Sequence, residues 1–191
     1  MQSKRRIIIL IVAGVLLLSG VILFTVFFHR GGEYPGYKQQ QRQNNFSKNL
    51  KDVNRFLVEK DNERIKSFIS RRGWNMEKTE TGLWYQIVKD QPGKTIEDDD
   101  QVIMNYEIRL LDGTLCYTSD STGVKKFIVG RKETVMGLQE GIKFLSEGDR
   151  ARLIIPPHLG HGLIGDEKRI PARAILVYTV HVLEVNQPET P

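Results

Sequence analysis

The sequence predicts an α+β domain with a mostly antiparallel sheet and one short helix, preceded by an apolar N-terminal helix and a short helical segment. Three patterns predict it. An uncharged apolar run covers residues 7–28, apolar residues recur at helical spacing between residues 46 and 69, and strand-like alternation dominates after residue 80. One helical pattern, between Glu133 and Leu145, interrupts the strands.

Composition excludes several classes of protein. The chain has 191 residues, of which 40% are hydrophobic and 27% charged, so it is neither collagen-like, wholly disordered nor a polytopic membrane protein. Residues 1–30 hold four of the 28 basic residues and no acidic one. The remaining 24 basic and 23 acidic residues nearly cancel, so the net charge of +5 gives no reason to expect nucleic acid as a partner.

Residues 1–30 are predicted to be a cytoplasmic N-terminus followed by a transmembrane signal anchor. The run 7–28 has 22 residues without a charge, and about 20 apolar helical residues cross a bilayer. It ends in Phe27 and Phe28 rather than in a small-residue cleavage site, which favours an uncleaved anchor; cleavage after processing is the alternative. The basic residues 4–6 place the N-terminus in the cytoplasm and the folded part in the periplasm, with a single pass through the inner membrane.

Residues 31–45 are predicted to be a flexible tether, because glycine, proline and a glutamine-rich run give too little apolar mass to pack. Residues 46–76 are predicted to form a helical segment, with two short amphipathic helices broken near residues 60–62. The segment either docks on the domain, which we favour, or serves as a dimerisation or substrate arm. Residues 188–191 form a tail.

Residues 77–187 are predicted to form the sheet domain. Four residues of one extended segment alternate onto one face: Val102, Met104, Tyr106 and Ile108. A turn at residues 111–114 returns the chain, and further strands are expected at 151–155 and 174–185.

Four motifs then occur in one order along residues 83–185. They are Tyr106-x4-Leu111-Asp112-Gly113, Phe127-x2-Gly130-x6-Gly137-x2-Glu140-Gly141, Gly148-x7-Pro156-Pro157-x2-Gly160-x-Gly162 and Ile170-Pro171-x4-Leu176-Val177-Tyr178-x-Val180. This order resembles the FKBP-type peptidyl-prolyl cis-trans isomerases. Residues 46–76 also look like the helical preamble of membrane-associated members from the Bacteroidetes. The resemblance implies a curved antiparallel sheet wrapped around the short helix.

The resemblance also implies rotation about Xaa-Pro peptide bonds in an apolar cavity, without a metal or a cofactor. Carried over by position, the catalytic residues are Tyr106, Tyr117, Val135, Leu138, His161, Ile170 and Tyr178. The substrate-binding residues are Cys116, Phe127, Glu133 and Thr134. From composition alone, several of these aromatic and aliphatic residues would be ordinary core.

Several positions depart from the family pattern. Cys116 and Tyr117 stand where the family usually has an aromatic residue and an aspartate, and Lys125 stands at another usual aromatic. The cavity floor, commonly tryptophan, falls on Leu138, and the hydrogen-bonding tyrosine falls on His161. A histidine still offers one hydrogen bond.

The sequence therefore predicts a membrane-anchored prolyl isomerase that assists the folding of exported proteins. Its expected partners are proline-containing polypeptides, the membrane and a translocation or secretion machinery. The alternative is a catalytically weak or inactive FKBP-fold binding or chaperone module in a membrane or secretion complex, for which the Cys116 and Tyr117 pair is the main support.

Overall fold

The computed structural model describes the backbone of residues 2–29 and 35–187 and the side chains of residues 14–27 and 39–187. The chain divides into two compact units, Met1–Val53 and Asn54–Pro191, and each is described by itself. The predicted tail, residues 188–191, lies outside the described residues.

The first unit is helical. It contains α1 (Gln2–His29) and the beginning of α2 (Pro35–Arg72). Among the side chains described, no helix is both long and apolar enough to cross a membrane, so the structure lends no support to the predicted transmembrane helix. Residues 7–13 and 28 of that predicted helix lie outside the described side chains.

Helix α2 is continuous, and this differs from two expectations. The predicted tether over residues 31–45 is helical from Pro35 onward, because glutamine, lysine and arginine are good helix formers and proline is tolerated in a first turn. The predicted break at residues 60–62 is wrong as well. Asp61 there is buried and pairs with Arg173 at 2.6 Å, so it fastens the helix to the domain instead of ending it.

Seven strands form one sheet in the second unit, and every described pairing is antiparallel. The strands are β1 (Glu77–Lys78), β2 (Trp84–Lys89), β3 (Gln101–Leu110), β4 (Leu115–Thr118), β5 (Lys125–Ile128), β6 (Arg150–Ile155) and β7 (Leu176–Asn186). Their order is β1-β2-β6-β7-β3-β4, with β5 paired to the first half of β3. The predicted strands at residues 102–109, 151–155 and 174–185 are confirmed, and so is the antiparallel sheet.

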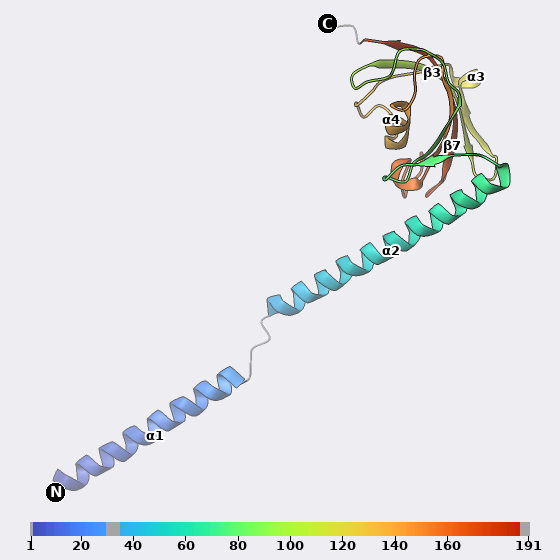
Figure 1. The fold of residues 1–191 in the computed structure, drawn as a ribbon. Coiled ribbons are helices and arrows are strands. Elements are labelled where there is room, and N and C mark those ends of the chain that lie inside the picture. Colours follow the sequence, from blue (N-terminus) through green and yellow to red (C-terminus); the bar gives the residue numbers. More distant parts are fainter. Residues whose placement is uncertain (1, 30–34, 188–191) are drawn as a thin grey trace. The chain divides into compact units, whose positions relative to one another are not determined.

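Three short helices complete this unit: α3 (Ser119–Thr122), α4 (Met136–Ile142) and the 3-10 turn η1 (Pro157–Leu159). The sheet curves around α4 (Figure 1), as the predicted fold requires. Two glycines of α4 permit this close approach. A Cβ on Gly137 would lie 2.5 Å from Ile155 Cγ2, and one on Gly141 would lie 2.7 Å from Leu153 Cδ1.

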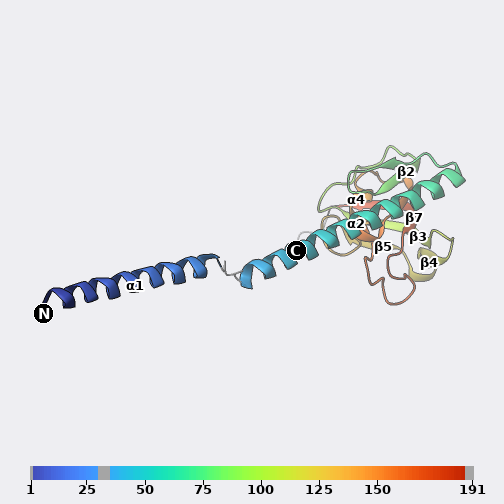
Figure 2. The same cartoon turned by 90° about the horizontal axis from the view of Figure 1, so that it is seen from below.

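The opposite face of the sheet carries the end of α2, which crosses the domain in Figure 2. Ile65 and Phe68 pack there against Ile154 and Val177, whose side chains alternate away from α4. The predicted docking is therefore confirmed for this half of the helical segment. In the first unit, the apolar Phe46 is exposed.

Candidate active site

Strand register brings three tyrosines onto the sheet face that α4 covers. Ile108 of β3 lies opposite Tyr178 of β7 on one side and opposite Tyr117 of β4 on the other. Paired residues of antiparallel strands lie on the same face of a sheet. Tyr106 lies on this face too, because it is two residues before Ile108 in the same strand. Tyr178 also lies opposite Leu153, the residue that packs on α4. The face predicted from the alternation in β3 is thus the face that forms the candidate site.

Buried side chains form the floor of this site. Leu138 of α4 is 0% exposed, Phe127 2%, and Tyr178 and Ile170 3% each. The half-buried Tyr106, Tyr117 and Val135 pack against the same cluster. The structure therefore brings together these seven sequence-predicted residues from six parts of the chain: β3, β4, β5, α4, the loop between β6 and β7, and β7.

The Tyr178 hydroxyl is an unusual feature of this floor. Burial raises the pKa of Tyr178, and the neighbouring Tyr106 and Cys116 raise it further. Its hydroxyl makes no hydrogen bond to another described residue, and it is not among the fully enclosed atoms without a partner, which are Asn62 Oδ1 and Trp84 Nε1. A peptide bond placed in the site would satisfy the Tyr178 hydroxyl.

Cys116 is the extra residue of a β-bulge, because Ile108 pairs with Tyr117 while the next residue, Arg109, pairs with Leu115. Its side chain is fully buried, and its Sγ lies 3.5 Å from the carbonyl oxygen of Arg169. Burial raises the pKa of the thiol. Cys116 is buried in the same cluster as Leu138, and its predicted contact with substrate stays a prediction.

Tyr117 meets a carboxylate that the sequence pattern did not reveal. Its hydroxyl donates a hydrogen bond to Asp166, which lies in the loop between β6 and β7. The hydrogen bond to Asp166 and burial raise the pKa of Tyr117. Desolvation alone would raise the pKa of Asp166. The hydrogen bonds from Tyr117 and from three backbone N–H groups outweigh it and hold that pKa well below its usual range. The site therefore contains the carboxylate whose loss the sequence suggested.

A sequence signal for Asp166 exists, although it is a local one. Asp166 follows Gly165 and precedes the floor residue Ile170 by four positions. Aspartate in such a turn often accepts backbone N–H groups a few residues ahead. Its partnership with Tyr117, 49 residues earlier, depends on the fold and has no signal in the local sequence.

The rim residues come from two loops. His161 is half-exposed, and among the described residues none hydrogen-bonds its imidazole. Glu133 is exposed, and its Oε2 accepts a 3.0 Å hydrogen bond from the backbone N–H of Ile128. The half-exposed Thr134 precedes Val135, the N-cap residue of α4. Glu133 and Thr134 thus stand beside the wall, as carried over from the family pattern.

Lys125 takes the place of an aromatic residue at one side of the site. Its ammonium lies 6.0 Å from the ring centroid of Tyr106, and burial lowers its pKa. Tyr106 in turn hydrogen-bonds Thr122 at 2.7 Å. The side chain of Lys125 is half-buried, so it borders the site without joining the buried floor.

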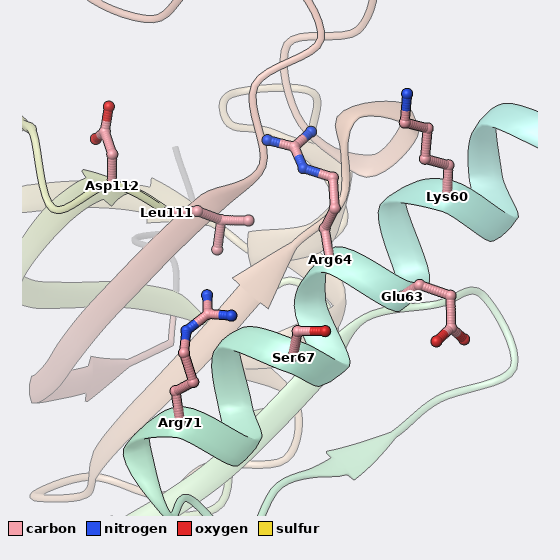
Figure 3. A pocket seen from close by; sticks show the side chains of 7 residues that line it. All are labelled: Lys60, Glu63, Arg64, Ser67, Arg71, Leu111 and Asp112. Atoms are coloured by element: carbon pink, nitrogen blue, oxygen red, sulfur yellow. The ribbon is translucent and has the colours of Figure 1, made fainter.

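A separate pocket of about 570 Å³ lies between the end of α2 and the turn after β3 (Figure 3). Its lining residues are Lys60, Glu63, Arg64, Ser67, Arg71, Leu111 and Asp112. Most of these side chains are charged and none is aromatic. The pocket therefore does not fit a proline ring, and the tyrosine-lined face is the better candidate.

The antiparallel sheet curved around α4 and the apolar cluster between them define an FKBP-like domain. Residues 93–183 match the family described as FKBP-type peptidyl-prolyl cis-trans isomerase, and the domain belongs to that family. The predicted family is therefore confirmed. The resemblance of residues 46–76 to members from the Bacteroidetes stays a prediction.

Known relatives agree with this assignment. The chain is 31% identical over 147 residues to the FKBP-type isomerase FkpA of Buchnera aphidicola, covering 72% of this chain and 57% of that protein. It is 34% identical over 105 residues to FkpA of Escherichia coli, covering 55% of this chain and 38% of that protein. The chain spans about half the length of the curated relatives it matches.

Solved structures show the same fold. The crystal structure of FkpA from Escherichia coli aligns with a TM-score of 0.58 at 28% identity, covering 91% of this chain and 82% of that one. The crystal structure of AtFKBP13 aligns with a TM-score of 0.55 at 20% identity, covering 58% and 98%. The second likeness supports the fold alone.

Proposed function

We propose that this chain accelerates cis-trans isomerisation of Xaa-Pro peptide bonds in polypeptides. The observation that carries the proposal is the set of half-buried side chains of Tyr106, Tyr117 and Val135. They pack against the buried cluster that contains Leu138, Ile170 and Tyr178. The accessible parts of these half-buried side chains offer a proline ring an apolar surface. The Tyr178 hydroxyl, which bonds no described residue, offers the adjoining amide one hydrogen-bond donor.

The chemistry needs no covalent step. Rotation about an Xaa-Pro bond must break amide resonance, and the barrier is about 18–20 kcal/mol. The planar amide carries more charge separation than the twisted transition state, so exclusion of water by the apolar walls favours the twisted form. A donor such as Tyr178 or His161 would orient the peptide while the bond turns.

A protease-coupled peptide assay with the full chain tests this function. We expect the cis-to-trans rate of an Xaa-Pro peptide to rise in proportion to enzyme concentration. Tyr106→Ala should lower kcat/KM about tenfold or more, because it removes part of the wall. Tyr85→Ala is a matched control, since Tyr85 is also half-buried against the core and its hydroxyl also bonds a neighbour, Glu77. Equal losses in both variants would contradict the assignment of the site.

A binding module without catalysis is the second candidate. Its support is the departure at Cys116 and Lys125, which leaves a small buried residue and a half-buried ammonium where the family usually has aromatic residues. In that case the wild-type chain would bind a proline peptide and leave its isomerisation rate unchanged.

We also propose that the chain is anchored in the inner membrane, with the isomerase domain in the periplasm acting on exported proteins near a translocation or secretion machinery. The support is the uncharged run 7–28 and the basic residues 4–6 before it. Fractionation of cells followed by a carbonate wash should leave the protein in the membrane pellet. External protease should then digest the domain in spheroplasts and spare it in intact cells. Release by carbonate, or protection in spheroplasts, would contradict the anchor or its orientation.

A further inference from the structure

The loop between β6 and β7 carries two residues of the candidate site, His161 and Ile170, and the carboxylate of Asp166 organises a turn between them. Asp166 Oδ1 accepts hydrogen bonds from the backbone N–H groups of Lys168, Arg169 and Ile170 at 3.0, 2.9 and 2.7 Å. The backbone N–H of Asp166 donates to the carbonyl of Ile170 at 3.0 Å. These bonds form a turn that fixes the backbone of the floor residue Ile170.

The second oxygen of the same carboxylate fastens this turn to the sheet. Asp166 Oδ2 accepts the hydrogen bond from the Tyr117 hydroxyl on β4. Arg169 adds a second tie, since its guanidinium donates to the carbonyl of Cys116 at 3.0 Å and lies 5.4 Å from the Tyr117 ring centroid. The loop and β4 thus meet at adjacent residues of the strand.

The turn also reaches the rim residue His161. The N–H of Gly165 donates to the carbonyl of His161 at 3.2 Å. Gly165 has φ +83°, and a Cβ there would lie 2.2 Å from the carbonyl oxygen of Ile170. The loop passes so close to itself that only glycine fits, and a shift of Asp166 would be transmitted to both site residues.

We propose that Asp166 is a positioning residue of the isomerase site, which holds His161 and Ile170 in place by fastening their loop to Tyr117 of β4. The proposal rests on the proposed function and extends it. In this chain the strand supplies a phenol and the loop supplies the carboxylate, whereas the family pattern quoted above has an aspartate at position 117. The carboxylate of Asp166 on the loop therefore takes the place of the carboxylate that the family pattern has at position 117.

The test is a double-mutant cycle with Tyr117→Phe, Asp166→Ala and the double variant, assayed as the full chain at equal folded fraction. We expect Asp166→Ala to lower kcat/KM about tenfold, because small misplacements of site groups have large effects on rate. Tyr117→Phe should lower kcat/KM less, because it removes only the hydrogen bond between Tyr117 and Asp166. The double variant should lose no more than Asp166→Ala does, because that hydrogen bond is already absent in Asp166→Ala. A loss within twofold for Asp166→Ala, or a double variant whose loss is the product of the two single losses, would overturn the proposal.

Asp61→Asn is the matched control. Asp61 of α2 pairs with the guanidinium of Arg173 at 2.6 Å, so it also ties this loop to another element, but without contacting Asp166 or Tyr117. The variant leaves the backbone hydrogen bond from Arg173 to Gly162 in place. We expect this variant to lower stability and to change kcat/KM less than twofold. A tenfold loss of kcat/KM in this control would show that any weakening of the loop impairs the site. That result would contradict a specific positioning role for Asp166.

Two further readouts separate this proposal from the proposed function. Hydrogen exchange should show the amides of residues 168–170 exchanging about tenfold faster in Asp166→Ala than in the wild-type chain. An alkaline absorbance titration should show one tyrosine ionising at lower pH in that variant, because the hydrogen bond to Asp166 raises the pKa of Tyr117.

If the wild-type chain binds a proline peptide without accelerating its isomerisation, the proposed function fails. Asp166→Ala should then weaken peptide binding about tenfold, and unchanged binding would overturn the positioning role too.

Discussion

The floor and the rim of the candidate site are held by different forces. The floor residues Leu138 and Phe127 are buried by side-chain packing between α4, β5 and the sheet. Beside the rim residue His161, Tyr117 and Asp166 are only partly buried, and a hydrogen bond between strand β4 and the loop holds them; we count these two residues with the rim from here on. We therefore expect substitutions in the floor to change mainly the stability of the domain, and substitutions at Tyr117 or Asp166 to change mainly the geometry of the site.

The largest expected effect is on the floor. Leu138→Ala should lower the free energy of unfolding by about 2–5 kcal/mol, because it opens a cavity in a fully buried position. Denaturant unfolding followed by circular dichroism measures this. A loss below about 1 kcal/mol would mean that the floor is loosely packed, and the contrast between floor and rim would then disappear.

A pair of glycines in the rim loop gives the next largest effect. Gly162 and Gly165 have φ values of +61° and +83°, but a Cβ on Gly162 would meet no atom within 4 Å, whereas one on Gly165 would collide with the Ile170 carbonyl. Gly162→Ala should therefore cost about 1 kcal/mol of stability, the cost of the backbone conformation alone. Gly165→Ala should cost more and should lower kcat/KM, measured by the protease-coupled assay. Equal effects of the two substitutions would show that the close approach does not control the site.

The pH dependence of stability sharpens the contrast further. Because hydrogen bonds hold the pKa of Asp166 below that of the unfolded chain, its contribution to stability is complete above about pH 5 and is lost as pH falls from about 4 toward 2. We estimate that contribution at about 1–2 kcal/mol, reduced by partial exposure. Thermal unfolding of the wild-type chain and Asp166→Asn should differ at pH 7, and this difference should shrink steadily as pH falls from about 4 toward 2. A constant difference across this range would contradict the ionised state of Asp166.

The floor could be predicted from the sequence and much of the rim could not. Alternation along β3 placed Tyr106 and Ile108 on one face, and helical spacing placed Val135 and Leu138 on a short helix, because both patterns are local. The bond between Tyr117 and Asp166 joins residues 49 positions apart and follows from the β-bulge at Cys116 and the path of the loop. No local pattern encodes such a contact. The continuity of α2 was missed for the same reason, since Asp61 finds its partner 112 residues later.

The smallest expected effect decides which side chain donates to the substrate, Tyr178 of the floor or His161 of the rim. Tyr178→Phe removes one hydroxyl that bonds no other described residue and keeps the buried ring, so it should leave the free energy of unfolding nearly unchanged. If that hydroxyl donates to the peptide, kcat/KM should still fall about fivefold, the effect of one hydrogen bond. His161→Leu tests the rim donor in the same assay, with His161→Gln as the variant that keeps a donor. A loss in Tyr178→Phe with full activity in His161→Leu would place the donor in the floor. Full activity in Tyr178→Phe with a loss in His161→Leu would place the donor in the rim. The loop between β6 and β7 would then supply both the hydrogen bond to the substrate and the turn that positions Ile170.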